Sequence, residues 1–104
     1  MKKMIRDGKV AVLVSVDFGA GWYSWNSESE ELLFDPIIVD AVENNLPFKS
    51  VEEYLEKTYP DNCYFGGYSD LVVNWIPENT KFRIDEYDGA ESLVTLDIDR
   101  YHTA

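Results

Sequence analysis

Two short segments place aromatic side chains directly beside glycines. The first is Phe18-Gly19-Ala20-Gly21-Trp22-Tyr23-Ser24-Trp25, and the second is Tyr64-Phe65-Gly66-Gly67-Tyr68. A glycine lets a ligand approach backbone N–H groups, and an indole or phenol ring offers a flat surface for stacking. Together the segments predict a recess for a small planar ligand. The alternative is that the rings fill the core and the glycines mark bends between strands.

Arginine is the side chain best suited to a phosphate group on such a ligand, because a guanidinium binds phosphate through two parallel hydrogen bonds. Arg83 lies within an alternating segment that predicts an outward-facing position for it. The alternative is an ion pair with a carboxylate on a neighbouring strand. The predicted ligand-binding residues are Phe18, Gly19, Gly21, Trp22, Trp25, Tyr64, Phe65, Gly67, Tyr68 and Arg83.

Catalysis has little support in the residue pattern. The single histidine, His102, lies near the end of the sequence, where a fixed side-chain geometry is uncommon. The single cysteine, Cys63, has no sequence neighbour suited to activating its thiol. We expect a non-enzymatic protein with no catalytic residue and no cofactor.

The chain carries a formal net charge of −11, and the charge is unevenly distributed. Residues 27–62 contain two basic and ten acidic residues, a local charge of −8. Contact with nucleic-acid phosphates or anionic membranes needs clustered Lys and Arg, so we expect neither. A field of carboxylates suits a basic surface on another protein instead. A further cluster, Asp85, Glu86, Asp88 and Glu91, matches no calcium loop, and we interpret it as solvated, with no metal site.

The elements that position these residues begin with a strand. Alternating β-branched residues predict it over residues 9–18, and apolar residues on both of its faces favour a central strand covered on both sides, or one whose outer face meets another subunit. A second short strand is predicted over residues 22–25, after the bend at Gly19–Gly21.

Two helices are predicted next. Asp35-Pro36 is typical of a helix start, and this helix should end near Asn45. Its apolar face is predicted to consist of Ile37, Ile38, Ala41 and Val42. Ser50 and Glu53 have the spacing of a capping box for a second helix, which Pro60 must terminate.

Strands are predicted over residues 63–65, 71–76, 82–87 and 91–98. Asp88-Gly89 is typical of a two-residue type I′ turn, which fixes the register of the last two strands. The predicted pairs are Tyr87 with Ala90, Ile84 with Leu93, and Phe82 with Thr95. The core face then holds Phe82, Ile84 and Leu93, and the opposite face holds Arg83, Asp85, Val94 and Leu96.

The whole pattern predicts a single α+β domain over residues 1–104, in the order β-β-α-α-β-β-β-β. We expect a mostly antiparallel sheet of four to six strands with two short helices packed on one face. Apolar outer positions at Val94 and Leu96, together with Tyr87, predict a homo-oligomer. One cysteine and no long apolar run predict a cytoplasmic protein.

Several segments together resemble a family of small bacteriophage-type proteins. They are Asp17-Phe18-Gly19-Ala20-Gly21-Trp22 with Trp25, Leu33-Phe34-Asp35-Pro36, Tyr64-Phe65-Gly66-Gly67, and Phe82-Arg83-Ile84-Asp85-Glu86-Tyr87-Asp88-Gly89-Ala90-Glu91-Ser92. The resemblance spans most of the chain. It implies a setting, the cytoplasm of a host cell, and no particular activity.

That setting implies two kinds of accessory role. We expect the chain to bind and sequester a small nucleotide-like ligand, such as an immune signalling nucleotide, as a sponge that counters bacterial defence. The alternative is an acidic protein-binding inhibitor that mimics nucleic acid and blocks a host defence protein. The aromatic-glycine segments and Arg83 suit the first role, and the acidic stretch from Glu28 to Asp61 suits the second.

Overall fold

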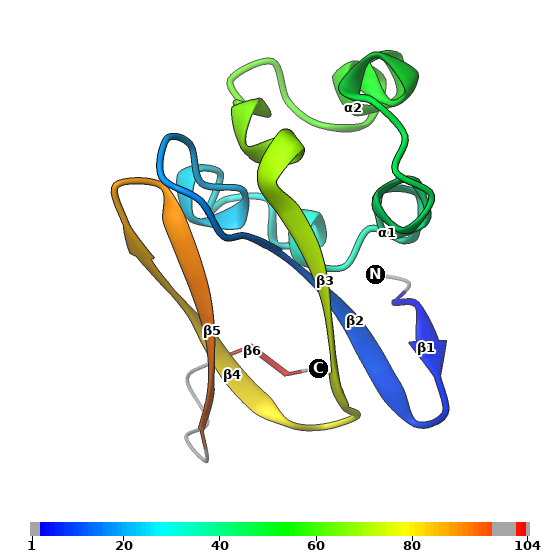
Figure 1. Ribbon diagram of the computed structural model, residues 1–104, viewed down its shortest axis with the longest axis vertical. Helices are drawn as coiled ribbons and strands as arrows, with labels where there is room; N and C mark the ends of the chain where they lie inside the picture. The colour runs from blue at the N-terminus through cyan, green and yellow to red at the C-terminus, as the bar shows by residue number, and fades with distance from the viewer. Residues whose placement is uncertain (1–2, 97–101, 104) are drawn as a thin grey trace.

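The computed structural model describes residues 3–96 and 102–103. The strands are β1 (Ile5–Arg6), β2 (Lys9–Ser15), β3 (Leu71–Pro77), β4 (Lys81–Tyr87), β5 (Ala90–Leu96) and β6 (His102–Thr103). The helices are α1 (Pro36–Glu43) and α2 (Glu52–Thr58), and 3₁₀ turns occupy Tyr23–Trp25, Glu30–Leu33, Phe48–Ser50 and Gly66–Asp70. The strands form two three-stranded antiparallel sheets, in the orders β1-β2-β3 and β5-β4-β6 (Figure 1).

Strand β2 is buried on both of its faces. Ala11 and Leu13 pack in a cluster with residues of α1 and α2, while Val12 and Val14 pack in a second cluster with Phe82 of β4. The predicted cover on both sides of this strand is therefore confirmed. The α+β class is also confirmed, and the order of strands and helices roughly matches the prediction. The strands divide into two sheets because each apolar face of β2 needs its own covering layer.

The β4–β5 hairpin has the predicted turn and register. Asp88 and Gly89 both have positive φ angles, 49° and 87°, as a type I′ turn requires. The three predicted pairs are present: Tyr87 with Ala90, Ile84 with Leu93, and Phe82 with Thr95. The same register also places Glu91 on the core face, where it is only 4% exposed. The interpretation of Glu91 as a solvated acidic residue is therefore wrong.

Helix α1 begins as predicted. The Asp35 carboxylate accepts hydrogen bonds from the backbone N–H groups of Ile37 and Ile38, at 2.9 Å and 3.4 Å. The buried face consists of Ile38, Val39 and Ala41. The prediction for Ile37 is wrong, since its side chain is 52% exposed and Val39 takes its place against the core.

Helix α2 ends before Pro60 as predicted, but it begins differently. Ser50 belongs to the 3₁₀ turn Phe48–Ser50, where its N–H bonds the Pro47 carbonyl, and Val51 precedes the helix. No side chain among the described residues caps α2, so the predicted capping box is wrong.

Two predicted strands are absent from the described residues. Residues 22–25 contain the 3₁₀ turn Tyr23–Trp25, and residues 63–65 lead into the 3₁₀ turn Gly66–Asp70. In the first segment, the N–H groups of Trp22 and Ser24 donate hydrogen bonds to the buried carboxylate of Glu91 rather than to a neighbouring strand. Residues 97–98 of the last predicted strand and the side chain of Leu96 lie outside the described part of the chain. Homo-oligomer formation through this outer face therefore stays a prediction.

Candidate functional site

Glu91 holds the first aromatic-glycine segment in its folded shape. Its Oε1 accepts a hydrogen bond from the backbone N–H of Ser15 at 2.9 Å. Its Oε2 accepts from the N–H groups of Trp22 and Ser24, at 2.7 Å and 2.9 Å, and from the Ser24 hydroxyl at 2.6 Å. The carboxylate therefore draws residues 22–24 inward, against the end of β2. Hydrogen bonds from N–H groups to a charged acceptor are among the stronger ones in proteins.

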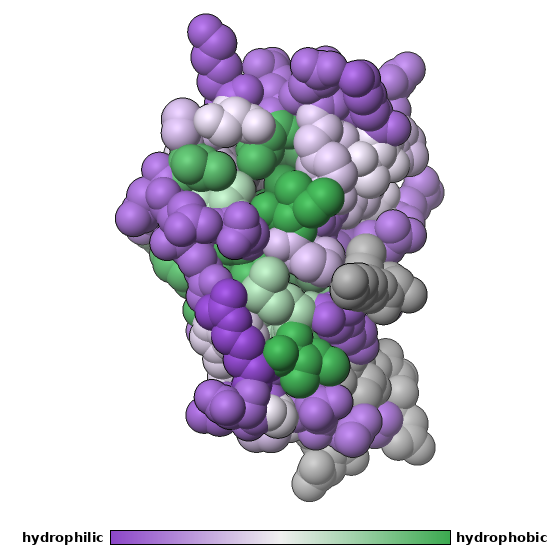
Figure 2. All heavy atoms as spheres, turned by 90° about the vertical axis from the view of Figure 1, so that its right-hand side faces the viewer, coloured by the Kyte–Doolittle hydropathy of each residue, from purple (hydrophilic) through white to green (hydrophobic). Residues whose placement is uncertain are grey.

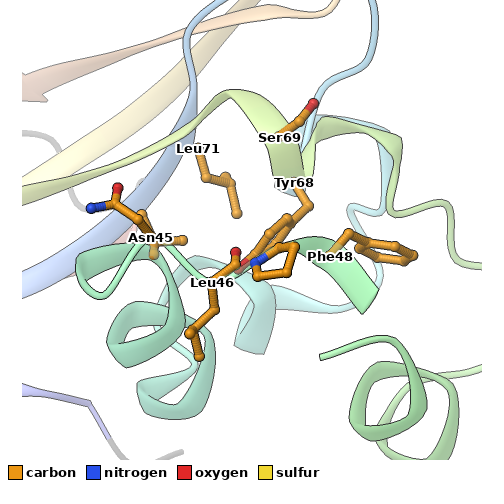
Figure 3. A pocket seen from close by; sticks show the side chains of 8 residues that line it. Asn45, Leu46, Phe48, Tyr68, Ser69 and Leu71 are labelled. Atoms are coloured by element: carbon orange, nitrogen blue, oxygen red, sulfur yellow. The ribbon is translucent and has the colours of Figure 1, made fainter. Parts of the chain in front are cut away.

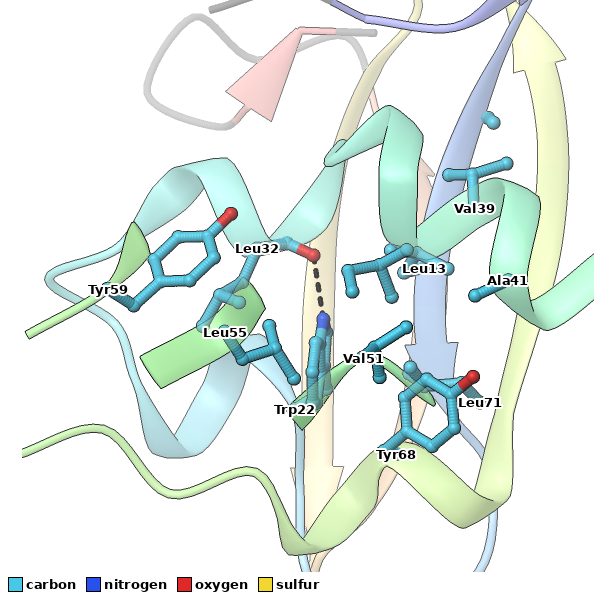
Figure 4. Packing of buried hydrophobic residues seen from close by; sticks show 12 residues of the cluster. Leu13, Trp22, Leu32, Val39, Ala41, Val51, Leu55, Tyr59, Tyr68 and Leu71 are labelled. Carbon is cyan, nitrogen blue, oxygen red and sulfur yellow. Dashed lines mark hydrogen bonds between the residues drawn. The ribbon is translucent and has the colours of Figure 1, made fainter. Parts of the chain in front are cut away.

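Trp22 is a core residue, with none of its surface exposed. Its Nε1 donates a 2.7 Å hydrogen bond to the carbonyl of Leu32 (Figure 4). Its ring contacts the rings of Phe65 and Tyr68. Tyr68 is buried as well, and its hydroxyl donates to the carbonyl of Leu46. The prediction that the Trp22 ring faces a ligand is wrong, because the core encloses it, whereas Tyr68, although buried, lines two of the hollows described below.

The glycines bring the two predicted segments together. A Cβ added to Gly67 would lie 2.7 Å from the carbonyl oxygen of Gly21, so the two backbones approach closer than side chains would permit. Gly21 and Gly67 are both buried. Gly19 donates its N–H to the carbonyl of Asp88 at 2.8 Å and so joins the loop after β2 to the hairpin turn (Figure 1). These glycines serve close packing of the chain, and Gly21 and Gly67 leave no room for a ligand between them.

Trp25 and Tyr64 form the exposed part of the predicted site. Their rings stack with centroids 5.8 Å apart and an interplanar angle of 27°. Trp25 is 46% exposed and Tyr64 is 55% exposed. We call this pair the aromatic ridge. Phe18, also predicted, is exposed elsewhere and contacts the ring of Tyr87 edge-on.

Hydrogen bonds with Glu86 and Asn26 hold the aromatic ridge in place. The Glu86 carboxylate accepts a 3.3 Å hydrogen bond from the Trp25 indole and a 2.7 Å bond from the N–H of Gly89 in the hairpin turn. Asn26 is buried, and its amide donates to the carbonyls of Trp22 and Tyr64 while accepting from the Tyr64 N–H. The backbone on both sides of the ridge is therefore fixed by side-chain hydrogen bonds.

A hollow lies on each side of the aromatic ridge. The polar hollow, of about 340 Å³, is lined by Trp25, Asn26, Ser27, Glu28, Ser29, Pro60, Asn62 and Cys63. The apolar hollow, of about 480 Å³, is lined by Phe48, Cys63, Tyr64, Phe65, Gly66, Tyr68 and Ser69. It shares Phe48, Tyr68 and Ser69 with a further hollow of about 420 Å³ beside Leu46 and Leu71 (Figure 3).

Cationic side chains do not line these hollows. None of the three hollows above has a Lys or Arg among its described lining residues. The same is true of two further hollows, one of about 420 Å³ beside Tyr59 and one of about 320 Å³ beside Asp61. Arg83 instead pairs with Asp85, two residues along the same strand, with Nε 2.8 Å from Oδ1. The ion pair expected as the alternative for Arg83 is thus present, and the partner that the structure describes, Asp85, lies on the same strand, β4.

The acidic segment is largely on the surface. Of the ten carboxylates in residues 27–62, all of them described, nine belong to exposed residues and only Asp35 is buried. The two lysines of this segment are Lys49 and Lys57, and Lys57 pairs with Glu53 at 2.6 Å. Figure 2 shows the face with β1 and the helices, where hydrophobic patches are separated by hydrophilic side chains. Within the described residues, no group of three or more His, Cys, Asp or Glu side chains is placed to hold a metal ion.

Asp35 joins α1 to the end of α2 through two tyrosines. Its Oδ2 accepts hydrogen bonds from the hydroxyls of Tyr54 and Tyr59, both at 2.6 Å. Burial, followed by the hydrogen bond to Asp35, raises the pKa of Tyr54 to about 12. The same causes in the same order raise the pKa of Tyr59 above its ordinary value. These hydroxyls stay protonated and act as structural donors.

A decrease in stability at high pH follows from this arrangement. The folded chain keeps the two tyrosine protons at pH values where the unfolded chain has lost them, so stability is complete below pH 10 and decreases as the pH rises toward 12. Urea unfolding at several pH values should show this decrease, and the double variant Tyr54→Phe/Tyr59→Phe should show less of it. Tyr87→Phe, on an exposed ring, is the matched control. An equal decrease in the double variant would contradict the role of the two hydroxyls.

The sequence pattern did not reveal three sets of side chains that support the candidate site and the helices beside it. Glu91 stands two residues before Leu93 in an alternating strand, so its inward position was detectable from alternation. Asn26 and the pair Tyr54 and Tyr59 depend on contacts 19 to 38 residues apart along the chain, which no local pattern reveals.

Comparison with known proteins gives no further guide. The chain matches no protein-family model, no curated protein and no solved structure. Among the described residues, no helix has the length and apolar character needed to span a bilayer.

Proposed function

We propose that the chain is a non-enzymatic, acidic protein-binding protein that docks on a cationic surface of a partner protein. The observation that carries the proposal is the exposure of nine of the ten carboxylates in residues 27–62. Side chains of one sign gathered on a surface attract a partner of the opposite sign and repel nucleic acid. The partner class that suits this field is a nucleic-acid-binding protein of the host cell, such as a defence protein.

The aromatic ridge adds an anchor to the electrostatic attraction. Interfaces between proteins concentrate their binding energy in a few aromatic or arginine side chains, surrounded by a polar rim. Trp25 and Tyr64 are exposed and stack on each other, and the exposed residue Glu28 lines the polar hollow together with Trp25. The combination of an exposed aromatic pair and an acidic rim supports protein binding.

Sequestration of a nucleotide-like ligand is the second candidate. The exposed rings of Trp25 and Tyr64 favour it, because a base can stack on an aromatic surface. The lining of the hollows favours it less, since the described residues around them place no Lys or Arg where a phosphate would bind.

Two measurements on the purified chain separate the candidates. The first is capture of nucleic-acid-binding proteins from a bacterial extract at low and high salt, with double-stranded DNA as competitor. The proposal predicts capture that DNA and salt both abolish, because the same cationic surface binds either the chain or DNA. A variant with Glu28, Glu30, Glu31, Glu52 and Glu56 changed to glutamine is the control, and it should capture little.

The second measurement is a thermal-shift screen against cyclic and linear nucleotides. A ligand selective for the folded chain raises its melting temperature. Protein binding predicts no shift with any nucleotide. A shift that persists at high salt, together with capture that the glutamine variant performs equally well, would replace the proposal with nucleotide sequestration.

A further inference from the structure

We infer that the aromatic ridge recognises a partner segment in which an arginine stands next to a bulky apolar residue. The inference rests on the proposed function and names the chemistry of the contact. The ridge separates the two hollows, since Trp25 lines only the polar one and Tyr64 lines only the apolar one. Cys63, which precedes Tyr64 in the chain, lines both hollows. An extended segment that runs along the ridge therefore places neighbouring side chains in hollows of opposite character, because successive side chains point to opposite sides of an extended chain.

The polar hollow suits a guanidinium group. Tyr64 stacks on Trp25, and the hollow on the other side of the ridge leaves part of the indole surface open to a ligand. A guanidinium stacks on indole more readily than an ammonium does, and its five N–H donors match the hydroxyl, amide and carboxylate oxygens of Ser27, Asn62 and Glu28. A volume of about 340 Å³ is near the lower limit for ligand pockets and suits one long side chain.

The surroundings of the polar hollow also favour a cation. Asp61 and Glu56 line an adjoining hollow that shares Pro60 and Cys63 with it. All three nearby carboxylates, including that of Glu28, belong to exposed residues. Because the described lining residues include no basic side chain, a partner must supply the positive charge.

The apolar hollow suits a leucine, methionine or phenylalanine side chain. Rings of Phe48, Tyr64, Phe65 and Tyr68 line it. It shares lining residues with the hollow beside Leu46 and Leu71 that Figure 3 shows. Tyr64 also packs closely over Gly66, where an added Cβ would lie 2.6 Å from the ring. The floor of the hollow is therefore preformed, which lowers the entropic cost of binding.

Short peptides test the inference without an identified partner. The probe is Gly-Ser-Arg-Leu-Ser-Gly, and its matched peptides replace arginine by lysine or leucine by serine. Titration followed by amide and indole NMR should shift the Trp25 indole N–H and the backbone N–H groups of Cys63, Tyr64 and Gly66. We expect the lysine peptide to bind about threefold more weakly and the serine peptide about tenfold more weakly. No shifts at about 5 mM peptide, or equal binding of all three peptides, would overturn the inference.

Variants of the chain complete the test. Trp25→Ala should weaken binding of the arginine peptide about tenfold, and Glu28→Gln should weaken this binding about threefold. Glu78→Gln removes the same charge from an exposed residue in the turn between β3 and β4, which lines neither hollow, and should have no effect beyond twofold. Equal effects of Glu28→Gln and Glu78→Gln would overturn the direct contact between Glu28 and the arginine.

The two proposals fail in distinguishable ways. Salt-sensitive capture that Trp25→Ala leaves intact would overturn the ridge inference and keep the acidic docking function. The opposite result is peptide binding at the ridge, but no capture of nucleic-acid-binding proteins that DNA can prevent. It would support the ridge inference and overturn the proposed function.

Discussion

Replacing Glu91 by alanine should lower the free energy of unfolding by about 3–5 kcal/mol. The carboxylate accepts four hydrogen bonds, three of them from backbone N–H groups of Ser15, Trp22 and Ser24. Two of these donors, on Ser15 and Trp22, are on buried residues and would lose their partner. Small domains have a total stability of about 5–15 kcal/mol, so the loss is a large part of it. Urea unfolding followed by circular dichroism measures the effect.

Two further variants show whether the hydrogen bonds are the cause. Glu91→Gln has the same size, but its NH₂ group faces N–H donors, so it should be less stable than the wild type and more stable than Glu91→Ala. Glu78→Gln removes a charge from an exposed position in the turn between β3 and β4 and should leave the urea midpoint unchanged. A loss below about 1 kcal/mol for Glu91→Ala would show that water replaces the carboxylate at little cost.

The hairpin that carries Glu91 shows what local sequence determines. Asp88-Gly89 needs positive φ angles at both positions, which few other residue pairs adopt without strain, so turn type and register followed from two residues. The start of α1 was equally local, because Asp35 caps N–H groups only two and three residues ahead. The charge of Glu91 suggested solvent, but alternation with Leu93 put it on the core face.

The missing strand at residues 22–25 shows what local sequence does not determine. Aromatic residues favour strands because they pack well on a pleated surface, and Trp22 to Trp25 fit that pattern. The actual conformation depends on two hydrogen bonds of Trp22 to distant acceptors. Its backbone N–H donates to the carboxylate of Glu91, 69 residues away, and its indole N–H donates to the carbonyl of Leu32. Neither partner could be identified from the segment itself.

The second sheet could not be predicted either, because it too depends on a partner that is distant in the sequence. The sequence of β2 shows that both of its faces need cover, and helices α1 and α2 supply one cover as expected. Periodicity does not say which element supplies the other. In the structure β4 does so with Phe82, whose ring meets that of Phe34 edge-on.

The candidate site was located in the right segments but assigned to partly wrong residues. Composition indicated aromatic side chains around Gly21 and Gly67, and the structure brings these two segments into contact. Exposure of each ring depends on the tertiary fold, which buries Trp22 and leaves Trp25 on the surface only three residues later. The 3₁₀ turn at Tyr23–Trp25 separates the two environments.

Alanine substitutions at the two tryptophans should therefore differ sharply. Trp22→Ala should lower the free energy of unfolding by about 3–5 kcal/mol, because it empties a fully buried site and leaves the Leu32 carbonyl without its donor. Trp25→Ala should lower it by less than about 1.5 kcal/mol, because nearly half of the ring is already in water and its bond to Glu86 is a long one. Urea unfolding of both variants measures the difference.

This comparison also decides which indole is available for binding. A well-folded Trp25→Ala variant that no longer binds basic segments would assign binding to the aromatic ridge. A Trp22→Ala variant as stable as the wild type would mean that the Trp22 ring adds nothing to the core, and the packing with Phe65 and Tyr68 would have to be reconsidered. The two rings lie three residues apart, so a reversed ranking of the two losses would contradict the placement of the whole segment, not only that of one side chain.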